Sequence, residues 1–348
     1  MAQDTIDGGY PDQIIEDVLD GNGDGVNVVD GNTAPPADFT PSAVPAPPRE
    51  IRSFWLESVD GSVVIPLDAN GRVLLPGATG LQLPPVDVVT GTTPGMPGSW
   101  LQEVNILERP IFLPLAFFSE ESQADFFASL SELRSLVSAW DGDLLGRSGT
   151  FRLGVTSAEG DRLLDVTYKS GWEGALGGGD GGSDWERFGL NLVAVAPFWQ
   201  AREVTAKSYS VPSGAVFLGS GDGSAPWPRR LTASTTVGAN MPIPVMGDVP
   251  VWPEFQFRGP IPSVEISWAG TTISVPGGVP TGQTLRLVTD PRGRSARIGD
   301  VIAWDRISMG ATFSPLLPGM NRVSIQLASA GEDARVDMSW YVQWKAAW

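Results

Sequence analysis

The residues whose types and spacing come nearest to a known chemistry form an acidic, glycine-rich segment close to the start of the chain. Asp20, Asn22 and Asp24 alternate with glycine, and a glycine follows at the sixth position, as in the first half of a calcium loop. The second half departs from this pattern, because the twelfth position is glycine and Asp30 comes one residue early. Two interpretations stay open: a shortened calcium site with ligands Asp20, Asn22, Asp24 and Asp30, or an acidic turn without metal.

Other chemistries are restricted by two absences from the composition. The chain has no histidine and no cysteine, which excludes Ser-His-Asp triads, His-ligated zinc, thiolate nucleophiles and disulfides. A glycoside hydrolase would need only two carboxyl groups about 5–10 Å apart across a groove. The available carboxylates include Asp165, Glu173, Glu254 and Glu265, but nothing in their spacing selects a pair, and solvated surface carboxylates explain them. We therefore expect no enzyme.

Tryptophan offers a different chemistry, because an exposed indole can stack on a sugar ring. The candidate sugar-stacking residues are Trp227, Trp252, Trp268 and Trp304, all in the second half of the chain. Burial of these side chains in a β-sandwich core is the alternative interpretation.

The charge balance argues against nucleic-acid binding. The formal net charge is −17, and the densest group of basic residues, Arg286, Arg292, Arg294 and Arg297, is too small and too spread to suggest a phosphate-binding site. An acidic surface would let DNA slide past without adhering, although solubility alone also explains the charge. The longest apolar run, residues 111–118, is too short to cross a bilayer, and no secretory signal is present. We expect a soluble protein made in a cytoplasm.

The elements that would position such residues are mostly short strands, because glycine (42) and proline (30) are both abundant. Strands are predicted at 54–56, 63–65 and 73–75, with hairpin turns at Asp60-Gly61 and Asn70-Gly71. Residues 90–98 are predicted to form a loop.

One long helix is predicted at 119–140. Ser119 is its expected N-cap, Glu120 and Glu121 would complement the positive helix end, and Asp141-Gly142 would end it. The apolar face that we expect to cover a sheet consists of Phe126, Phe127, Leu130, Leu133, Val137 and Trp140.

The rest of the chain has the pattern of strands and turns. Alternating residues predict paired strands near 151–155 and 164–168 and a further strand at 185–195. The second half predicts strands at 265–275, 283–289 and 297–304, and a last strand in which apolar residues alternate from Val336 to Trp344. Two antiparallel sheets packed as a sandwich would bury these residues.

These observations predict a mainly β protein in three parts. Residues 1–48 form an acidic and then proline-rich extension or tether, which should be extended and poorly able to pack. Residues 49–208 form an α+β domain with the helix 119–140 on its sheet, and residues 209–348 form a β-sandwich.

From about residue 50 onward, the chain resembles the distal tail protein of long-tailed, non-contractile bacteriophages, especially those of actinobacterial hosts. The matching features are the Arg109-Pro110 strand entry, the helix, the return strand at 161–171, Pro197-Phe198-Trp199, and the segments 247–253 and 315–321. Their order and spacing carry the resemblance, since no single motif is diagnostic.

The resemblance implies a structural virion protein at the phage tail tip, synthesised in the host cytoplasm. It implies a homo-hexameric ring, built by the first domain, that joins the tail tube protein to the tape-measure protein and other tip proteins. Genomic DNA would pass through an acidic channel without specific binding, and no membrane insertion is expected. The second domain would be a galectin-like sandwich, although the absence of histidine excludes the usual galectin sugar site. A carbohydrate-binding host-recognition protein is the alternative function.

Overall fold

The computed structural model describes residues 52–69, 71–138, 149–174, 181–210, 236–328 and 333–348. Their fold is mainly β with one α-helix among the described residues, which confirms the predicted fold class. Within these ranges, no helix is both long enough and apolar enough to span a membrane. The extension 1–48 with its candidate calcium ligands, together with Trp227, lies outside the described residues.

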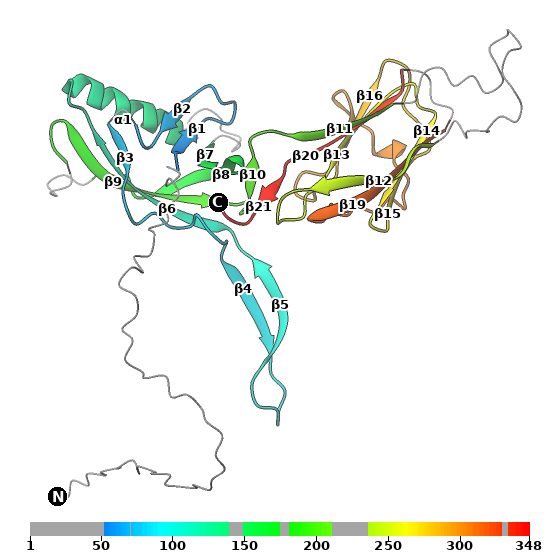
Figure 1. Cartoon of the computed structure of the whole chain (residues 1–348), viewed down its shortest axis with the longest axis horizontal. Coiled ribbons are helices and arrows are strands. Elements are labelled where there is room, and N and C mark those ends of the chain that lie inside the picture. The colour runs from blue at the N-terminus through cyan, green and yellow to red at the C-terminus, as the bar shows by residue number, and fades with distance from the viewer. Residues whose placement is uncertain (1–51, 70, 139–148, 175–180, 211–235, 329–332) are drawn as a thin grey trace, which may run out of the picture. The chain divides into compact units, whose positions relative to one another are not determined.

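The first core is built on a nine-stranded antiparallel sheet, here called the large sheet (Figure 1). Its main path is β2-β1-β7-β8-β9-β6-β3, while β10 pairs with β8 and with β21. The strands are β1 (Phe54–Glu57), β2 (Val64–Pro66), β3 (Arg72–Leu74), β6 (Arg109–Phe118), β7 (Thr150–Ser157), β8 (Gly160–Ser170), β9 (Trp185–Ala194), β10 (Trp199–Ala201) and β21 (Gln343–Trp344). The two ends of the sheet come together, because the N–H of Leu74 in β3 donates to the carbonyl of Leu67, which directly follows β2, at 2.8 Å. The sheet is therefore strongly curled.

The helix α1 (Gln123–Val137) covers one face of the large sheet (Figure 1). It begins later than predicted: Ser122, and not Ser119, is the N-cap, and its hydroxyl accepts the Asp125 N–H at 3.1 Å. The residues buried by the helix are Phe126, Leu130, Leu133, Leu136 and Val137. Phe127 was wrongly assigned to this face and is 55% exposed, because the buried residues continue the row that starts at Phe126 and Phe127 lies on the neighbouring side of the helix. Trp140 lies outside the described residues.

The strands that flank the two predicted early turns pair differently, and Asn70 itself lies outside the described residues. β1 pairs with β2 across the Asp60-Gly61 turn, as predicted. After Asn70-Gly71, however, β3 pairs with β6 at the opposite end of the large sheet. A turn signal predicts where the chain reverses, but it does not predict which strand the next segment pairs with. Here the pairing partner of β3 follows from the curl of the sheet.

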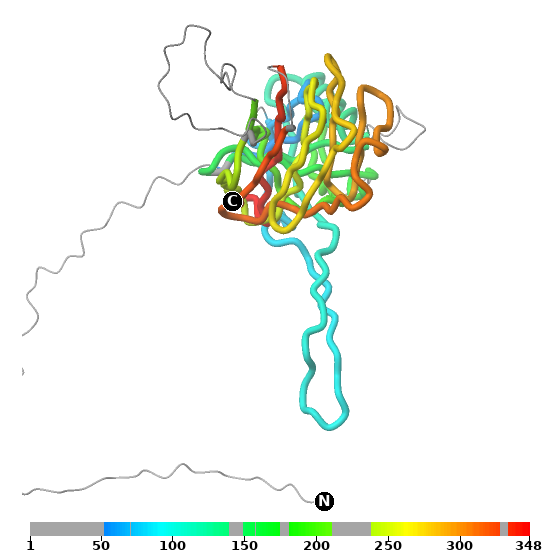
Figure 2. Tube along the Cα trace, turned by 90° about the vertical axis from the view of Figure 1, so that its right-hand side faces the viewer, coloured from blue at the N-terminus to red at the C-terminus, as the bar shows by residue number. Residues whose placement is uncertain are grey.

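A second hairpin, absent from the sequence predictions, consists of β4 (Val86–Gly91) and β5 (Trp100–Ile106). The predicted loop at 90–98 is mostly the tip of this hairpin. In Figures 1 and 2 the two strands leave the large sheet together, and among the described strands they pair only with each other. Within the described part of the chain, the hairpin therefore lacks a sheet or helix against which to pack.

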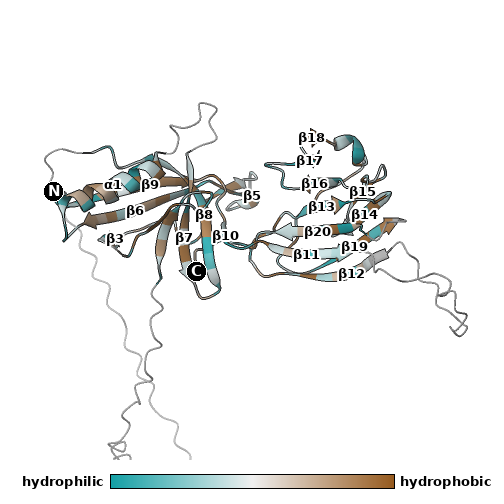
Figure 3. Cartoon of the chain, turned by 90° about the horizontal axis from the view of Figure 1, so that it is seen from above, coloured by the Kyte–Doolittle hydropathy of each residue, from teal (hydrophilic) through white to brown (hydrophobic). Residues whose placement is uncertain are grey.

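The second core lies between two further antiparallel sheets, which form a sandwich (Figure 3). The six-stranded sheet has the order β11-β20-β13-β16-β17-β18, and the four-stranded sheet has the order β12-β19-β14-β15. The strands are β11 (Thr205–Ser210), β12 (Thr236–Val245), β13 (Glu254–Arg258), β14 (Ser263–Trp268), β15 (Thr271–Val275), β16 (Thr284–Val288), β17 (Ser295–Ile298), β18 (Val301–Ile302), β19 (Gly319–Ala328) and β20 (Arg335–Trp340). The predicted boundary at residues 208 and 209 falls inside β11.

Three predicted strands of this half are divided in the structure. The segment 265–275 is the hairpin β14–β15, because Ala269 and Gly270 take positive φ angles and form a tight turn. The segment 297–304 likewise turns between β17 and β18 and ends in a 3-10 helix (Trp304–Arg306). The alternation that begins at Val336 is real, but the chain leaves the six-stranded sheet after Trp340 and joins the large sheet as β21.

Candidate functional site

The carboxylates considered for hydrolysis are dispersed over three sheets. Asp165 lies on β8 of the large sheet, where it accepts from Arg152 at 3.1 Å, and Glu173 accepts the Gly171 N–H just beyond the same strand. Glu254 lies on β13 of the six-stranded sheet and Glu265 on β14 of the four-stranded sheet. These four positions do not form a pair of carboxylates that face each other across a groove. Within the described ranges, no group of acidic side chains is arranged to hold a metal ion.

The candidate tryptophans have different environments. Trp268 is only 2% exposed, and its indole N–H donates to the Ser314 carbonyl, so its ring offers no face to a sugar. Trp252 is half-buried. Trp304 is 39% exposed and meets the edge of Phe313 at 6.4 Å between ring centroids. Of the candidates in the described chain, Trp304 therefore has the most accessible ring.

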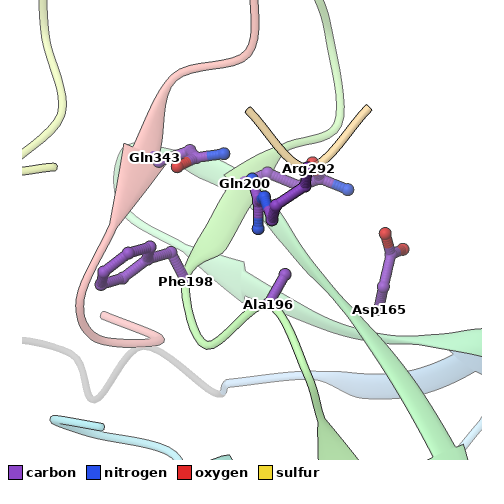
Figure 4. A pocket seen from close by; sticks show the side chains of 6 residues that line it. All are labelled: Asp165, Ala196, Phe198, Gln200, Arg292 and Gln343. Atoms are coloured by element: carbon purple, nitrogen blue, oxygen red, sulfur yellow. The ribbon is translucent and has the colours of Figure 1, made fainter. Parts of the chain in front are cut away.

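A small pocket of about 170 Å³ lies between the large sheet and the turn that joins β16 to β17 (Figure 4). Asp165 and Gln200 come from the large sheet, and Arg292 comes from the turn. Hydrogen bonding to Asp290 raises the pKa of the Arg292 guanidinium, so this group is a permanent cation. The side chains that line this pocket do not include a nucleophile or general base next to a second catalytic group. The pocket therefore does not resemble an active site.

The β4–β5 hairpin has the features of an interaction surface. Val88 lies opposite Val104 and Val86 opposite Ile106, so these four side chains share one face. Each is between 47% and 51% exposed. A lone two-stranded hairpin is marginally stable in water, and apolar side chains on its open face add a further cost. This face, which we call the hairpin apolar face, is therefore suited to contact with another molecule.

Arg109 is the most unusual buried residue of the first core. It is fully buried, and its guanidinium donates to the carbonyl oxygens of Pro197, Gly80, Gln82 and Lys345. Burial lowers the pKa of Arg109 to about 10, so the side chain is still charged at neutral pH. In the sequence, the Arg109-Pro110 pair indicated only the start of a strand. The Arg109 side chain also joins several segments by hydrogen bonds, and these could not be predicted because the segments are distant in sequence.

The segment 341–348, here called the C-terminal tail, packs into the first core. β21 pairs with β10, and the Ala347 N–H donates to the Leu81 carbonyl at 2.9 Å. Ala347 is fully buried there, and Trp348 lies under the Arg52 guanidinium at 4.1 Å. The C-terminal tail thus contributes to a core that also contains residues near position 54.

Comparison with known proteins finds the fold but no sequence family. No family model matches the sequence, and no curated protein matches it. Nine chains of solved structures do match. The crystal structure of the Dit protein of phage SPP1, titled a paradigm of hub adsorption apparatus in Gram-positive infecting phages, covers 84% of this chain and 99% of its own, with 11% identity and a TM-score of 0.54.

Two structures of the phage P2 baseplate in its activated conformation also match. The one with Ca has 9% identity and a TM-score of 0.48, and the one with Sr has 10% identity and a TM-score of 0.49. Each covers 84% of this chain and 98% of its own. The fold assignment rests on the Dit comparison alone, which spans most of this chain. The chain therefore has the fold of the SPP1 Dit protein.

Proposed function

We propose that this chain is a distal tail protein, a structural and non-enzymatic component of the phage virion at the tip of the tail. The observation that carries the proposal is the fold likeness to the SPP1 Dit protein over 84% of this chain and 99% of that one. The earlier resemblance to phages of actinobacterial hosts stays part of the proposal.

In this proposal, six copies form a ring through head-to-tail contacts. Such contacts join two different surfaces of the same chain and close when the rotation between neighbours divides the circle. The hairpin apolar face supplies one of the two surfaces, because its four half-exposed apolar residues have no cover within the described chain. A neighbouring copy would bury them.

The ring would join the tail tube protein to the tape-measure protein and other tip proteins. The net charge of −17 supports a channel that genomic DNA crosses without adhering. As part of the same proposal, the protein is made in the host cytoplasm and becomes part of the virion. Calcium binding by Asp20, Asn22, Asp24 and Asp30 is a separate proposal.

Native mass spectrometry and negative-stain imaging of the full-length protein test the ring. We expect a six-membered ring for the wild type and monomers for the variant in which Val86, Val88, Val104 and Ile106 are all replaced by threonine. Threonine keeps the β-branched shape and the strand propensity while removing apolar surface. The matched control replaces Val301 and Ile302, two exposed residues of β18, by threonine and should keep the ring.

Either of two results would contradict this account. A strict monomer, both alone and with purified tail tubes, would overturn the ring. A ring that persists unchanged in the four-threonine variant would exclude the hairpin apolar face as a subunit contact.

A second candidate function is recognition of a host carbohydrate by the sandwich. The observation that favours it is the accessible ring of Trp304 beside Phe313. Ring assembly and sugar binding are compatible, so the discriminating result is glycan binding that requires Trp304 while the oligomer is unchanged.

A further inference from the structure

The chain passes between the large sheet and the sandwich through two segments that lie side by side. One segment joins β10 to β11, and the other joins β20 to β21. Gln200 pairs with Gln343 at the large sheet (Figure 4), and Thr205 pairs with Trp340 at the six-stranded sheet. The two segments therefore form a two-stranded crossing that is bounded by these pairs. We call it the connecting ribbon.

The two segments of the connecting ribbon differ in length. Between the bounding pairs, residues 201–204 on one side lie opposite only Tyr341 and Val342 on the other. The Ala201 N–H still donates to the Val342 carbonyl at 2.9 Å, so the extra length falls at residues 202–204. Extra residues on one strand of an antiparallel pair bend that strand and increase its twist. Because two strands alone are also marginally stable, the connecting ribbon has the construction of a hinge.

Arg202, in the longer segment, ties the connecting ribbon to the large sheet. Its guanidinium donates to the Glu57 carboxylate of β1 and lies 3.5 Å from the Asp161 carboxylate of β8. The same guanidinium lies over the Trp55 ring, 5.5 Å from the ring centroid. The Arg202 backbone N–H also donates to the Asp161 carbonyl at 3.3 Å. A planar guanidinium that contacts two strands restrains the direction of the bulged segment as well as its distance from the sheet.

Glu57, the carboxylate that receives Arg202, is buried and positioned by its neighbours. Its side chain is 2% exposed, the Trp55 indole N–H donates to it at 2.8 Å, and the Arg152 guanidinium lies 4.0 Å away. The indole fits against β7 because position 154 is glycine, where a Cβ atom would lie 2.0 Å from the ring. A buried ion pair often adds little net stability, but it can select one conformation. The function that we infer for Glu57 is to position Arg202.

The second segment of the connecting ribbon is held from the side of the sandwich. Asp248, between β12 and β13, donates its N–H to the Gln343 carbonyl at 3.1 Å. The Asp248 carboxylate accepts the Lys345 N–H at 2.8 Å. Gly247 allows this approach, since a Cβ atom there would lie 2.1 Å from the Gln343 carbonyl oxygen. Each segment of the ribbon is thus tied to a different sheet, and the tie to the large sheet includes the side chain of Arg202, which is 43% exposed.

We propose that Arg202 is a latch that fixes the angle between the large sheet and the sandwich. While its guanidinium contacts Glu57 and Asp161, the bulged segment cannot bend independently of the large sheet. Without these contacts the connecting ribbon bends at residues 202–204, and the sandwich takes several angles, as two domains do unless a large apolar contact joins them. The pocket of about 170 Å³ beside the ribbon leaves space for this motion. The inference does not depend on ring assembly, because all these residues belong to one chain.

The test measures the distance between two spin labels by pulsed EPR. Because the chain has no cysteine, Ala128→Cys on α1 and Gln326→Cys on β19, both at exposed positions, can be labelled selectively. The labelled full-length chain is diluted into unlabelled chain, so that each assembly contains one labelled pair. With Arg202 intact we expect one narrow distance maximum, and in Arg202→Gln we expect its loss and a broad distribution. Arg202→Lys should give an intermediate width, since lysine keeps the charge but lacks the planar fork.

The matched control is Arg297→Gln, the same substitution at an exposed position of β17 outside the connecting ribbon, and it should keep the narrow maximum. A narrow maximum in Arg202→Gln would overturn the latch, and so would a broad distribution while Arg202 is intact. Equal broadening in Arg297→Gln would also overturn it, because the loss of order would then not depend on the ribbon.

Discussion

Arg109 brings a positive charge into the first core, where its four acceptors are neutral backbone carbonyls and not a carboxylate. A buried cation of this kind is stabilised only while its hydrogen bonds are complete. The acceptors come from residues 80, 82, 197 and 345, so one side chain joins the segment after β3, the turn before β10 and the C-terminal tail.

Arg109→Met should therefore lower the free energy of unfolding by more than about 3 kcal/mol, because it leaves several buried carbonyl oxygens without donors. Arg109→Lys should have a smaller effect, since lysine keeps the charge but reaches fewer acceptors. Denaturant titration monitored by tryptophan fluorescence measures both. Arg322→Met, at an exposed site, is the control, and an equal loss in the control and in Arg109→Met would contradict the joining role.

At the scale of the elements, the start of helix α1 allows two nearby serines to be compared as N-caps. The hydroxyl of Ser122 accepts the Asp125 N–H at 3.1 Å, while that of Ser119 accepts two N–H groups at 3.3 and 3.4 Å before the helix begins. Ser122→Ala should cost about 1 kcal/mol of stability, the usual value for a lost N-cap. Ser119→Ala should cost clearly less in the same thermal unfolding assay. The reverse order would restore Ser119 as the cap.

Elements with a strong local pattern were predictable from the sequence. The β1–β2 hairpin, most of the helix face and the alternation after Val336 follow from turn residues and apolar spacing, which act over a few residues. Phe127 was misplaced because a run of adjacent aromatics fits two neighbouring helix faces equally well. The β4–β5 hairpin was missed because its apolar face joins neither core of the described residues.

Pairing between distant segments was not predictable in the same way. Nothing near Gln343 indicates that it pairs with Gln200, and nothing near Arg258 indicates that Arg335 lies opposite. Both depend on the strand order of a whole sheet, which is fixed by the packing of both cores. The candidate interaction surfaces of this protein therefore depend on the strand order of its sheets and cannot be predicted from the local sequence.

At the scale of the whole molecule, the C-terminal tail links the end of the sequence to the first core. Ala347→Asp would bury an unpaired carboxylate at a fully buried position, and should lower the free energy of unfolding by about 3 kcal/mol or more. Lys345→Asp introduces the same side chain two residues earlier, where the side chain is exposed, and should have little effect. Thermal unfolding with limited proteolysis distinguishes them, and equal melting temperatures would show that the tail is dispensable.

The position of Ala347 also has a consequence for biosynthesis. During translation, the strands from β1 to β10 leave the ribosome long before residue 347, yet their core lacks β21, Ala347 and one acceptor of Arg109 until residues 343–347 have also been made. Contacts that join such distant segments form late and slowly. The first core therefore completes its packing only after the residues of the second core have been translated.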